Sequence, residues 1–415
     1  MISEKMMSLG KKSSVIREIF EYGKKRKSEI GAENVFDFSL GNPSVPAPAE
    51  VTEIMKEFLE TVPAEILHGY TSGPGDIGVR TEIANYINNK FGVEACANLI
   101  YMTCGAAASL TISLNAIVNS GDEVIVLAPF FPEYRVFAEQ AGATLKVVAC
   151  KTEDLQIDFA NLEKAITNKT KAIIVNSPNN PSGVIVPECD IIKLSELLNN
   201  KQKEYGTDIY LLADEPYREL VFTGEEVPYI PSYYDNTIVC YSYSKALSLP
   251  GERIGYIFVS PKVINCGDVY AAVCGAGRAL GYVCAPSLMQ YTIAKCLDKT
   301  ADVSIYEANR KMLYEALTEY GYTVIKPDGA FYMFVKSPVE DANEFCEMAK
   351  KYELLLVPSD DFGVNGFVRI SYCVSPEQIK NSLPAFKKLI EEYKKWAKKM
   401  SCNKQEKSST MLIKR

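Results

Sequence analysis

The stretch Ile209-Tyr-Leu-Leu-Ala-Asp-Glu-Pro-Tyr217 decides the fold class, because an apolar run leads directly into an acidic turn. The pattern recurs at residues 237–241, followed by Ser242-Tyr-Ser-Lys245, and at residues 172–176, followed by Ser-Pro-Asn-Asn-Pro. In open α/β sheets, ligands bind outside the carboxyl ends of the strands. The stretch therefore predicts a buried strand whose polar end belongs to a binding site.

Strand-like and helix-like patterns alternate through the middle of the chain. Short β-branched runs predict strands at residues 99–103, 123–127, 144–149, 172–176, 209–213, 237–241 and 253–259. Helical patterns lie between the earlier ones, at about residues 106–119, 133–141, 159–166 and 188–205. Such alternation implies crossovers and a sheet covered on both faces. We predict an α/β fold in which a large domain carries a mostly parallel seven-stranded sheet.

The two ends of the chain follow another pattern. Residues 1–35 hold a helical stripe of Ile16, Ile19 and Phe20 and the basic run Lys24-Lys-Arg-Lys27, which we interpret as a solvated helix face rather than a nuclear or anionic-lipid signal. Beyond residue 300, helices are predicted at 305–320, 342–352 and from 376, and strands at 322–325, 330–335, 354–357 and 367–372. We expect a large domain at 46–295, a smaller α+β domain from 1–45 and 296–400, and a disordered polar tail at 401–415.

Composition excludes several classes of protein. The chain has 415 residues, more than one hydrophobic core usually supports, and a net charge of −7, which argues against a nucleic-acid partner. His68 is the one histidine, so His-rich metal sites and Ser-His-Asp or Cys-His catalytic sites elsewhere in the chain are excluded. We interpret His68 as a loop residue without a chemical role. The alternative is a position near a pocket. No apolar run reaches membrane-spanning length, the N-terminus is too polar for a secretory signal, and scattered cysteines predict reduced thiols in the cytoplasm.

A lysine and an aspartate stand at the ends of two predicted strands. Lys245 closely follows the strand at 237–241, and a lysine that forms an imine must be partly neutral, which burial and cationic neighbours favour. Asp214 ends the strand at 209–213, where a carboxylate is costly unless it is paired, and a pyridinium N–H is a suitable partner. An ordinary surface lysine and a capping aspartate are the alternatives.

Further polar and aromatic side chains suit the same ring. Tyr217 lies three residues after Asp214, and Asn180 lies in the turn Pro178-Asn-Asn-Pro181, so both can donate to a ring oxygen. A plain structural turn would give the same pattern around Asn180. Phe131, in Pro129-Phe-Phe-Pro132, is placed to stack on a pyridine ring, although packing in a core is the commoner role of a phenylalanine.

Two segments suit a phosphate. Gly105-Ala-Ala-Ala-Ser-Leu110 opens a helix directly after the strand at 99–103, which offers backbone N–H groups and a positive helix end. A simple strand–helix junction is the alternative. Ser242, Ser244 and Arg253 add hydroxyl and guanidinium donors. Together with Lys245 and Asp214, these are the groups that hold and tune pyridoxal 5′-phosphate (PLP).

Arg369 lies in the apolar run Phe367-Val-Arg-Ile-Ser-Tyr372, where a charge must be paired. The α-carboxylate of an amino-acid substrate would accept a bidentate interaction from it. An internal salt bridge is the alternative.

Over roughly residues 35–395 this motif set resembles the class I/II aminotransferases, which are fold type I PLP enzymes related to aspartate aminotransferase. The resemblance implies that Lys245 forms the imine and moves the substrate proton. It implies that Asp214 binds the pyridine nitrogen, and that Asn180 and Tyr217 bind the ring oxygen. For the phosphate, it implies the side chains of Ser242, Ser244 and Arg253, with backbone donors at Ala106 and Ala107 beside Gly105.

The same resemblance implies a substrate site and a dimer. Gly41, in Leu40-Gly-Asn-Pro43, and Arg369 match positions that hold the α-carboxylate, and Asn180 also borders the substrate. Tyr70, in Tyr70-Thr-Ser-Gly-Pro-Gly75, resembles the tyrosine that reaches a neighbouring subunit's phosphate. A homodimer with shared active sites follows from this resemblance.

Two features depart from the usual pattern. Phe131 stands where many relatives place a tyrosine or tryptophan, so it can stack but has no polar tip. The run Cys274-Gly-Ala-Gly-Arg-Ala-Leu-Gly-Tyr282 lies where dicarboxylate-specific members carry side chains that reach across the dimer. Arg278 is therefore a candidate to bind the distal carboxylate of aspartate or glutamate.

The resemblance implies transfer of an amino group from an L-amino acid to a 2-oxo acid, with 2-oxoglutarate as the expected acceptor. The sequence does not name the donor's side chain. The same pocket could support a PLP-dependent β-elimination or decarboxylation, because a fold does not fix the chemistry. A second alternative is the aminotransferase-like sensor domain of a transcription regulator, but the residues before Phe36 are too few for a winged helix.

Overall fold

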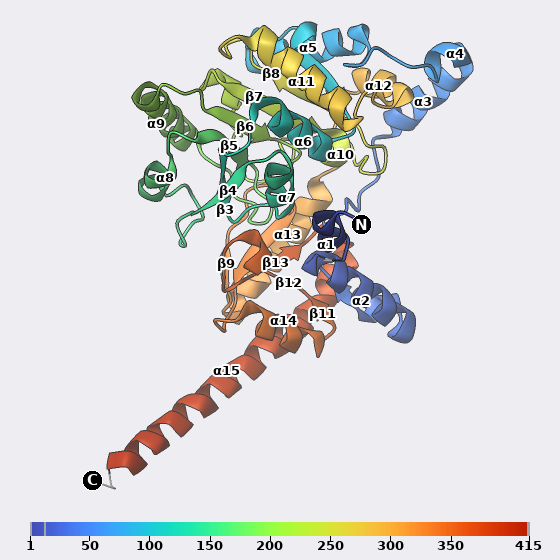
Figure 1. The fold of residues 1–415 in the computed structure, drawn as a ribbon. Coiled ribbons are helices and arrows are strands. Elements are labelled where there is room, and N and C mark those ends of the chain that lie inside the picture. The colour runs from blue at the N-terminus through green and yellow to red at the C-terminus, as the bar shows by residue number, and fades with distance from the viewer. Residues whose placement is uncertain (1, 12–13, 413–415) are drawn as a thin grey trace. The chain divides into compact units, whose positions relative to one another are not determined.

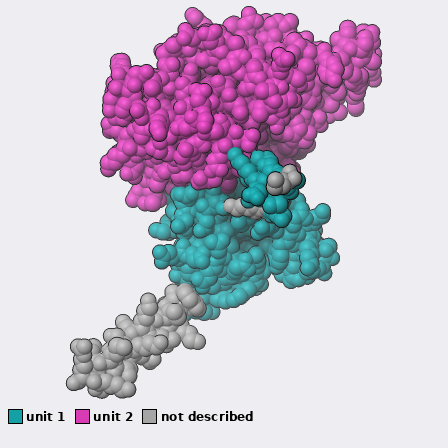
Figure 2. Space-filling model, viewed as in Figure 1, with its two compact units in different colours: residues 1–41, 306–326, 331–415 teal, residues 42–305, 327–330 magenta. Residues whose placement is uncertain are grey.

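The structure, a computed structural model, describes residues 2–11 and 14–412, with side chains described up to residue 395. The chain divides into two compact units (Figure 2). Unit 1 comprises residues 1–41, 306–326 and 331–415, and unit 2 comprises residues 42–305 and 327–330. Each unit is described by itself below.

A seven-stranded sheet forms the centre of unit 2. Its spatial order is β2 (Ile100–Thr103), β8 (Gly255–Val259), β7 (Thr237–Ser242), β6 (Tyr210–Asp214), β5 (Thr170–Asn176), β3 (Glu123–Ala128) and β4 (Thr144–Ala149). The strands from β7 to β4 pair in parallel, whereas β8 runs antiparallel to both β2 and β7. The predicted α/β fold with a mostly parallel seven-stranded sheet is confirmed.

Figure 1 shows the helices of unit 2, several of which pack against this sheet. They are α3 (Ala49–Thr61), α4 (Ala64–Leu67), α5 (Ile77–Phe91), α6 (Ala106–Ile117), α7 (Glu133–Gln140), α8 (Phe159–Ala165), α9 (Glu188–Tyr205), α10 (Tyr243–Ala246), α11 (Cys266–Leu280) and α12 (Ser287–Ala294). Helix α6 packs on β7 and β8, α5 on β2, and α7 and α8 on β4. Every residue of β6 and β7 is buried, as expected for strands with both faces covered.

Three predicted strand boundaries need correction. Strand β8 begins at Gly255, because Arg253 has a left-handed backbone with a φ of 54° and cannot continue the ladder. The expected strand at 330–335 begins at Tyr332, after Ala330 with a φ of 57°. The expected strand at 354–357 is two short strands, β11 (Leu354–Leu355) and β12 (Val357–Pro358), which join different sheets.

Unit 1 has an α+β arrangement. Its antiparallel sheet has the order β12, β13 (Phe367–Ser371), β10 (Tyr332–Lys336) and β9 (Thr323–Ile325), and β1 (Phe36–Asp37) pairs in parallel with β11. Its helices are α1 (Glu4–Lys11), α2 (Val15–Ile30), α13 (Ser304–Tyr320), α14 (Ala342–Lys350) and α15 (Pro376–Leu412). Helix α15 extends through residues 401–412, which are the first part of the expected polar tail. Residues 413–415 of the expected tail lie outside the described residues.

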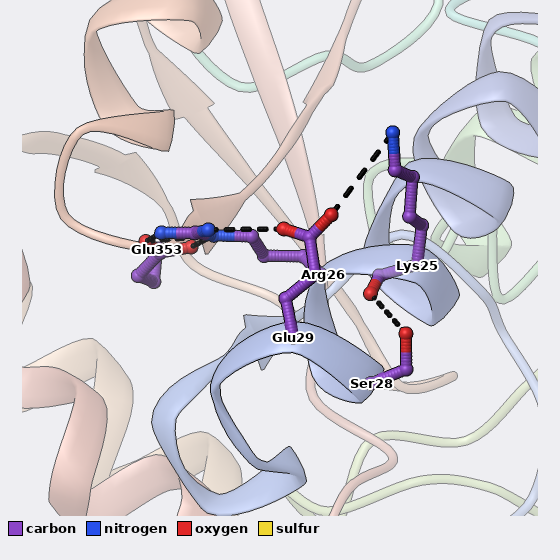
Figure 3. A network of polar contacts seen from close by, with 5 residues as sticks. All are labelled: Lys25, Arg26, Ser28, Glu29 and Glu353. Carbon is purple, nitrogen blue, oxygen red and sulfur yellow. Dashed lines mark hydrogen bonds and ion pairs between the residues drawn. The ribbon is translucent and has the colours of Figure 1, made fainter.

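The basic run on α2 makes ion pairs inside unit 1. Arg26 Nε donates to both carboxylate oxygens of Glu353, at 3.0 and 3.1 Å, and Arg26 Nη1 lies 3.1 Å from Glu29 (Figure 3). Lys27 Nζ lies 3.0 Å from Asp37 Oδ2. These contacts tie α2 to β1 and to the segment before β11, which gives the run a structural role.

No helix of the described chain combines the length and apolar character needed to cross a membrane.

Candidate cofactor and substrate site

The carboxyl ends of three parallel strands place polar residues together at one edge of the unit 2 sheet. Asn176 on β5 pairs in register with Asp214 on β6, and β7 beside them ends at Ser242. Asn176 Nδ2 donates to the Asp214 carbonyl at 2.9 Å, and Asn176 Oδ1 accepts from the Asn180 backbone N–H at 2.7 Å. The Asn180 turn is therefore fixed to the strand that carries Asp214.

Asp214 is a buried carboxylate with one oxygen left open. Its Oδ2 accepts a hydrogen bond from the Tyr134 hydroxyl, while its Oδ1 is buried and has no hydrogen-bond partner among the described residues. Burial raises the pKa of Asp214 to about 7, although the bond from Tyr134 acts in the opposite direction. A buried carboxylate with an open oxygen is suited to a ligand that brings an N–H group with positive charge.

The residues expected around a pyridine ring follow these strands. Tyr217 and Asn180 are both buried, at 5% and 7% exposure. Lys245 is half-buried and belongs to the short helix α10, whose N-cap Ser242 continues directly from β7. Phe131 is half-buried and meets the Tyr134 ring edge-on, with 5.7 Å between ring centroids.

Three segments of unit 2 bring hydrogen-bond donors together in what we call the cradle beside Gly105. Gly105 has a φ of 90° at the N-cap of α6, and a Cβ placed there would lie 2.9 Å from Arg253 Nη2. Arg253 Nη1 lies 3.5 Å from Ser244 Oγ, which in turn accepts from Ser242 Oγ at 2.8 Å. The first backbone bond of α6 runs from Ser109 to Gly105, so the N–H groups of Ala106 and Ala107 have no acceptor within the helix. These donors suit an anion, and the left-handed backbone of Arg253 marks a strained position at the site.

Unit 1 holds the two residues expected at a substrate carboxylate. Arg369 on β13 is 2% exposed, donates from Nη2 to the Ser39 carbonyl at 2.5 Å, and lies over the Tyr332 and Phe362 rings. Gly41 also contacts Tyr332, because a Cβ at Gly41 would lie 2.0 Å from the Tyr332 hydroxyl. Gly41 and Arg369 are therefore linked through Tyr332, and a side chain at position 41 would displace that ring.

The chain is similar to known proteins over most of its length. Residues 33–386 match the family Aminotransferase class I and II. The chain belongs to this family. It is 29% identical over 375 residues to an aspartate aminotransferase of Thermotoga maritima, which covers 89% of this chain and 95% of that protein.

Solved aminotransferase structures share the fold. A crystal structure of an amino transferase from Eubacterium rectale is 55% identical, with a TM-score of 0.93 over 94% of this chain and 99% of that one. The aspartate aminotransferase from Thermus thermophilus with maleate is 25% identical, with a TM-score of 0.82 over 94% of this chain and 100% of that one. The predicted class I/II aminotransferase of fold type I is confirmed, and with it a PLP-dependent transaminase.

The residues of this aminotransferase fit PLP. The open Oδ1 of Asp214 suits the ring N–H, and the cradle beside Gly105, which an added Cβ would obstruct, suits the phosphate. In the described chain, no group of three or more His, Cys, Asp or Glu residues has the arrangement of a metal site.

Three of the residues considered from the sequence lie at the surface. Tyr70 is 97% exposed, Arg278 is exposed in the last turn of α11, and His68 is an exposed residue at the end of α4. The Tyr70 loop is held by Gln290, whose Nε2 donates to Thr71 Oγ1 at 3.2 Å and whose Oε1 accepts from the Asp76 N–H at 2.8 Å.

Sequence reasoning missed Tyr134. Its hydroxyl reaches Asp214, a residue 80 positions later in the chain. The available signal was its place three residues after Phe131, at the start of the helix that follows strand β3. Nothing in that local pattern names a carboxylate as the partner.

Proposed function

We propose that this aminotransferase transfers the amino group of an L-amino acid, aspartate or another dicarboxylate, to a 2-oxo acid, with 2-oxoglutarate as the acceptor. The observation that carries the proposal is the buried, half-open carboxylate of Asp214 at a strand end next to the strand that leads into Lys245. When bound, PLP supplies an electron sink for the charge left at the substrate Cα. The protein supplies the binding groups and the proton transfer.

Each residue of unit 2 has a distinct role in this proposal. Asp214 Oδ1 accepts the ring N–H and keeps that nitrogen protonated, while Asn180 and Tyr217 donate to the ring oxygen. Lys245 Nζ would be the point of covalent attachment, and once released it would move the proton from the substrate Cα to C4′ of the cofactor. A positioned general base of this kind contributes about 10²–10⁴-fold to the rate.

Anions are held by two sets of donors. Ser242, Ser244, Arg253 and the backbone N–H groups of Ala106 and Ala107 bind the phosphate. Arg369, supported by the chain around Gly41, binds the substrate α-carboxylate in a bidentate interaction. The donor chemistry and the family match support both roles.

The proposed dicarboxylate preference rests on two observations. Thermotoga and Pyrococcus relatives are named aspartate aminotransferases, and the Thermus structure contains maleate, which is a dicarboxylate. Arg278 is the candidate for the distal carboxylate, because its exposed guanidinium on α11 can accept an anionic ligand. An aromatic-amino-acid aminotransferase of Thermococcus litoralis is 26% identical over 402 residues, so aromatic donors belong in the same test.

The proposed assembly is a cytoplasmic homodimer in which Tyr70 reaches the phosphate of the partner subunit. Supporting it, unit 2 exposes large apolar side chains along α3–α5 and after α11, namely Leu59, Ile66, Ile77, Tyr282 and Val283, beside Tyr70. An exposed apolar surface of this kind indicates a protein partner. Light scattering should give twice the mass of 46.0 kDa, and Tyr70→Phe should weaken cofactor retention in an intact dimer.

Covalent trapping is the decisive experiment. Borohydride reduction of the protein incubated with PLP, followed by peptide mass spectrometry, should place the adduct on Lys245, and Lys245→Ala should lose turnover but keep its fold. An adduct on another lysine, or none, contradicts the proposal. A panel of amino acids with and without 2-oxoglutarate then identifies the donor; keto-acid formation with ammonia release and no acceptor would favour an elimination reaction instead.

A further inference from the structure

We infer that Tyr134 is a positioning residue that favours the charged form of Asp214 and fixes the orientation required by the cofactor's ring nitrogen. The inference rests on the proposed function of Asp214, and it adds a residue of α7 that would act through Asp214. Its support is the geometry of one hydrogen bond and of the aromatic packing that fixes it.

The Tyr134 side chain has a defined position. It is 2% exposed, and its hydroxyl donates to Asp214 Oδ2. The ring is stacked with Phe130, at a centroid distance of 6.4 Å and an interplanar angle of 15°, and meets Phe131 edge-on at 86°. The Tyr134 backbone N–H also donates to the Phe131 carbonyl at 3.0 Å. Two phenylalanines and the start of α7 therefore aim the hydroxyl at the carboxylate.

This contact divides the two oxygens of Asp214 between protein and ligand. Because Oδ2 is occupied by the phenol, Oδ1 is the oxygen that stays open among the described residues. A carboxylate fixed through one oxygen cannot rotate freely, so its second oxygen keeps one direction. Preorganised polar groups of this kind bind a ligand without a reorganisation cost when it arrives.

The phenol also influences the charge of Asp214. Burial raises the pKa of the Tyr134 hydroxyl far above its usual value, so the hydroxyl keeps its proton and remains a donor. Donation to the carboxylate favours the ionised form and opposes the effect of burial on Asp214. The other titratable groups near this pair are Glu215 and Tyr217 in the same chain segment and Cys240 on β7. Of these, Glu215 acts against ionisation of Asp214, which leaves Tyr134 as the stabilising donor that the structure shows.

The test compares Tyr134→Phe with a matched control, Tyr234→Phe. Tyr234 is also fully buried in unit 2 and donates a single hydrogen bond, at 2.7 Å, to the Ile209 carbonyl. The probes are PLP and its 1-deaza analogue, in which carbon replaces the ring nitrogen, and the measured quantity is the Kd of each probe for the apoprotein. Both variants lose one buried hydroxyl, so general destabilisation affects them alike.

The expected result distinguishes an effect on binding of the ring nitrogen from an effect on binding of the rest of the cofactor. Tyr134→Phe should weaken PLP binding by about tenfold, the lower range for a hydrogen bond to a charged group, and change deaza-analogue binding by less than about twofold. Tyr234→Phe should change neither by more than about twofold. The PLP affinity of Tyr134→Phe should also begin to fall at a higher pH than in the unmodified protein, because Asp214 then takes up a proton more readily.

Several results would overturn the inference. Equal weakening of both probes would show that Tyr134 only supports the fold, and unchanged PLP binding would show that it has no role. If Tyr134→Phe does not fold, 3-fluorotyrosine incorporated at position 134 keeps the shape and strengthens the donor, so the pH at which PLP affinity falls should move down; an unmoved value contradicts the inference. Failure of the unmodified protein to attach PLP at Lys245 is a separate outcome, because it overturns the proposed function itself.

Discussion

Two neighbouring carboxylates at the end of β6 lie in contrasting surroundings. Asp214 accepts one hydrogen bond from a tyrosine and keeps a buried oxygen open. Glu215, the next residue, accepts from both Nε and Nη2 of Arg218, and the first of these bonds is 2.6 Å long. Arg218 also donates to the carbonyls of Val227 and Pro228 and lies over the rings of Phe91 and Tyr229.

The contrast distinguishes a structural charge from a charge kept for a ligand. Asp214 is the last residue of β6 and Glu215 follows it, yet the two carboxylates bind different partners, Tyr134 and Arg218. The protein itself supplies the partner of Glu215, whereas the described residues around Asp214 leave a place for one. Burial raises the pKa of both, and Arg218 opposes this effect for Glu215.

The largest effect should come from removing the partner of Glu215. Arg218→Met keeps much of the side-chain volume but leaves a buried carboxylate unpaired, which should lower the free energy of unfolding by about 3–5 kcal/mol. Urea unfolding of the apoprotein measures this. The double variant Glu215→Gln/Arg218→Met removes both charges and should recover a large part of the loss. A loss below about 1 kcal/mol in the single variant would show that the two carboxylates are less different than their contacts indicate.

Removing the charge of the other carboxylate, Asp214, should weaken cofactor binding. Asp214→Asn keeps an acceptor for Tyr134 but removes the charge that pairs with the ring N–H, so PLP affinity should fall by about 10- to 150-fold, the range for a hydrogen bond to a charged group. Equilibrium titration of the apoprotein with PLP gives the Kd. Glu215→Gln is the matched control and should leave PLP affinity within about threefold. Equal losses in both variants would contradict the separation of roles.

The pH dependence of stability should sharpen the same comparison. Burial raises the pKa of Asp214 to about 7 in the folded apoprotein. Between about pH 4 and 7, Asp214 is therefore protonated in the folded protein but ionised in the unfolded chain. The unfolded state then binds fewer protons, so stability is highest below that window and falls as the pH rises through it, by at most about 1.4 kcal/mol per pH unit. Between about pH 5 and 8 the apoprotein should lose roughly 2 kcal/mol more than Asp214→Asn does in urea unfolding. Parallel pH profiles for the two proteins would show that Asp214 ionises normally.

The strands of the large sheet and the residues at their ends could be predicted from the sequence. Asp214 and Lys245 follow apolar runs directly, so their position at one edge of a sheet can be deduced from periodicity and the rules for α/β folds. The same reasoning was wrong at Arg253, which was expected in strand β8. Arg253 precedes that strand because its backbone is left-handed. Backbone strain of this kind has no signature in an apolar pattern.

Contacts between distant segments could not be deduced in this way. Tyr134 meets Asp214, and Arg26 meets Glu353, across 80 and 327 residues of chain. Each contact depends on how helices pack against sheets, which composition and spacing do not specify. For the same reason the sequence identified Asp214 as a carboxylate in need of a partner but could not show that Glu215 had already found one.

The smallest effect should come from Lys90, at the solvent edge of the Glu215 cluster. Its Nζ lies 3.7 Å from Glu219 Oε1 and its side chain is 39% exposed, so solvent screens the pair. Lys90→Met should therefore lower the free energy of unfolding by about 0.2–1 kcal/mol, and the loss should shrink at high ionic strength. Urea unfolding at low and high salt measures both effects, with Arg218→Met as the control whose loss should persist in salt, because its ion pair is buried. A salt-independent loss above about 2 kcal/mol would place Lys90 inside the buried network, and Glu215 would then depend on two cations rather than one.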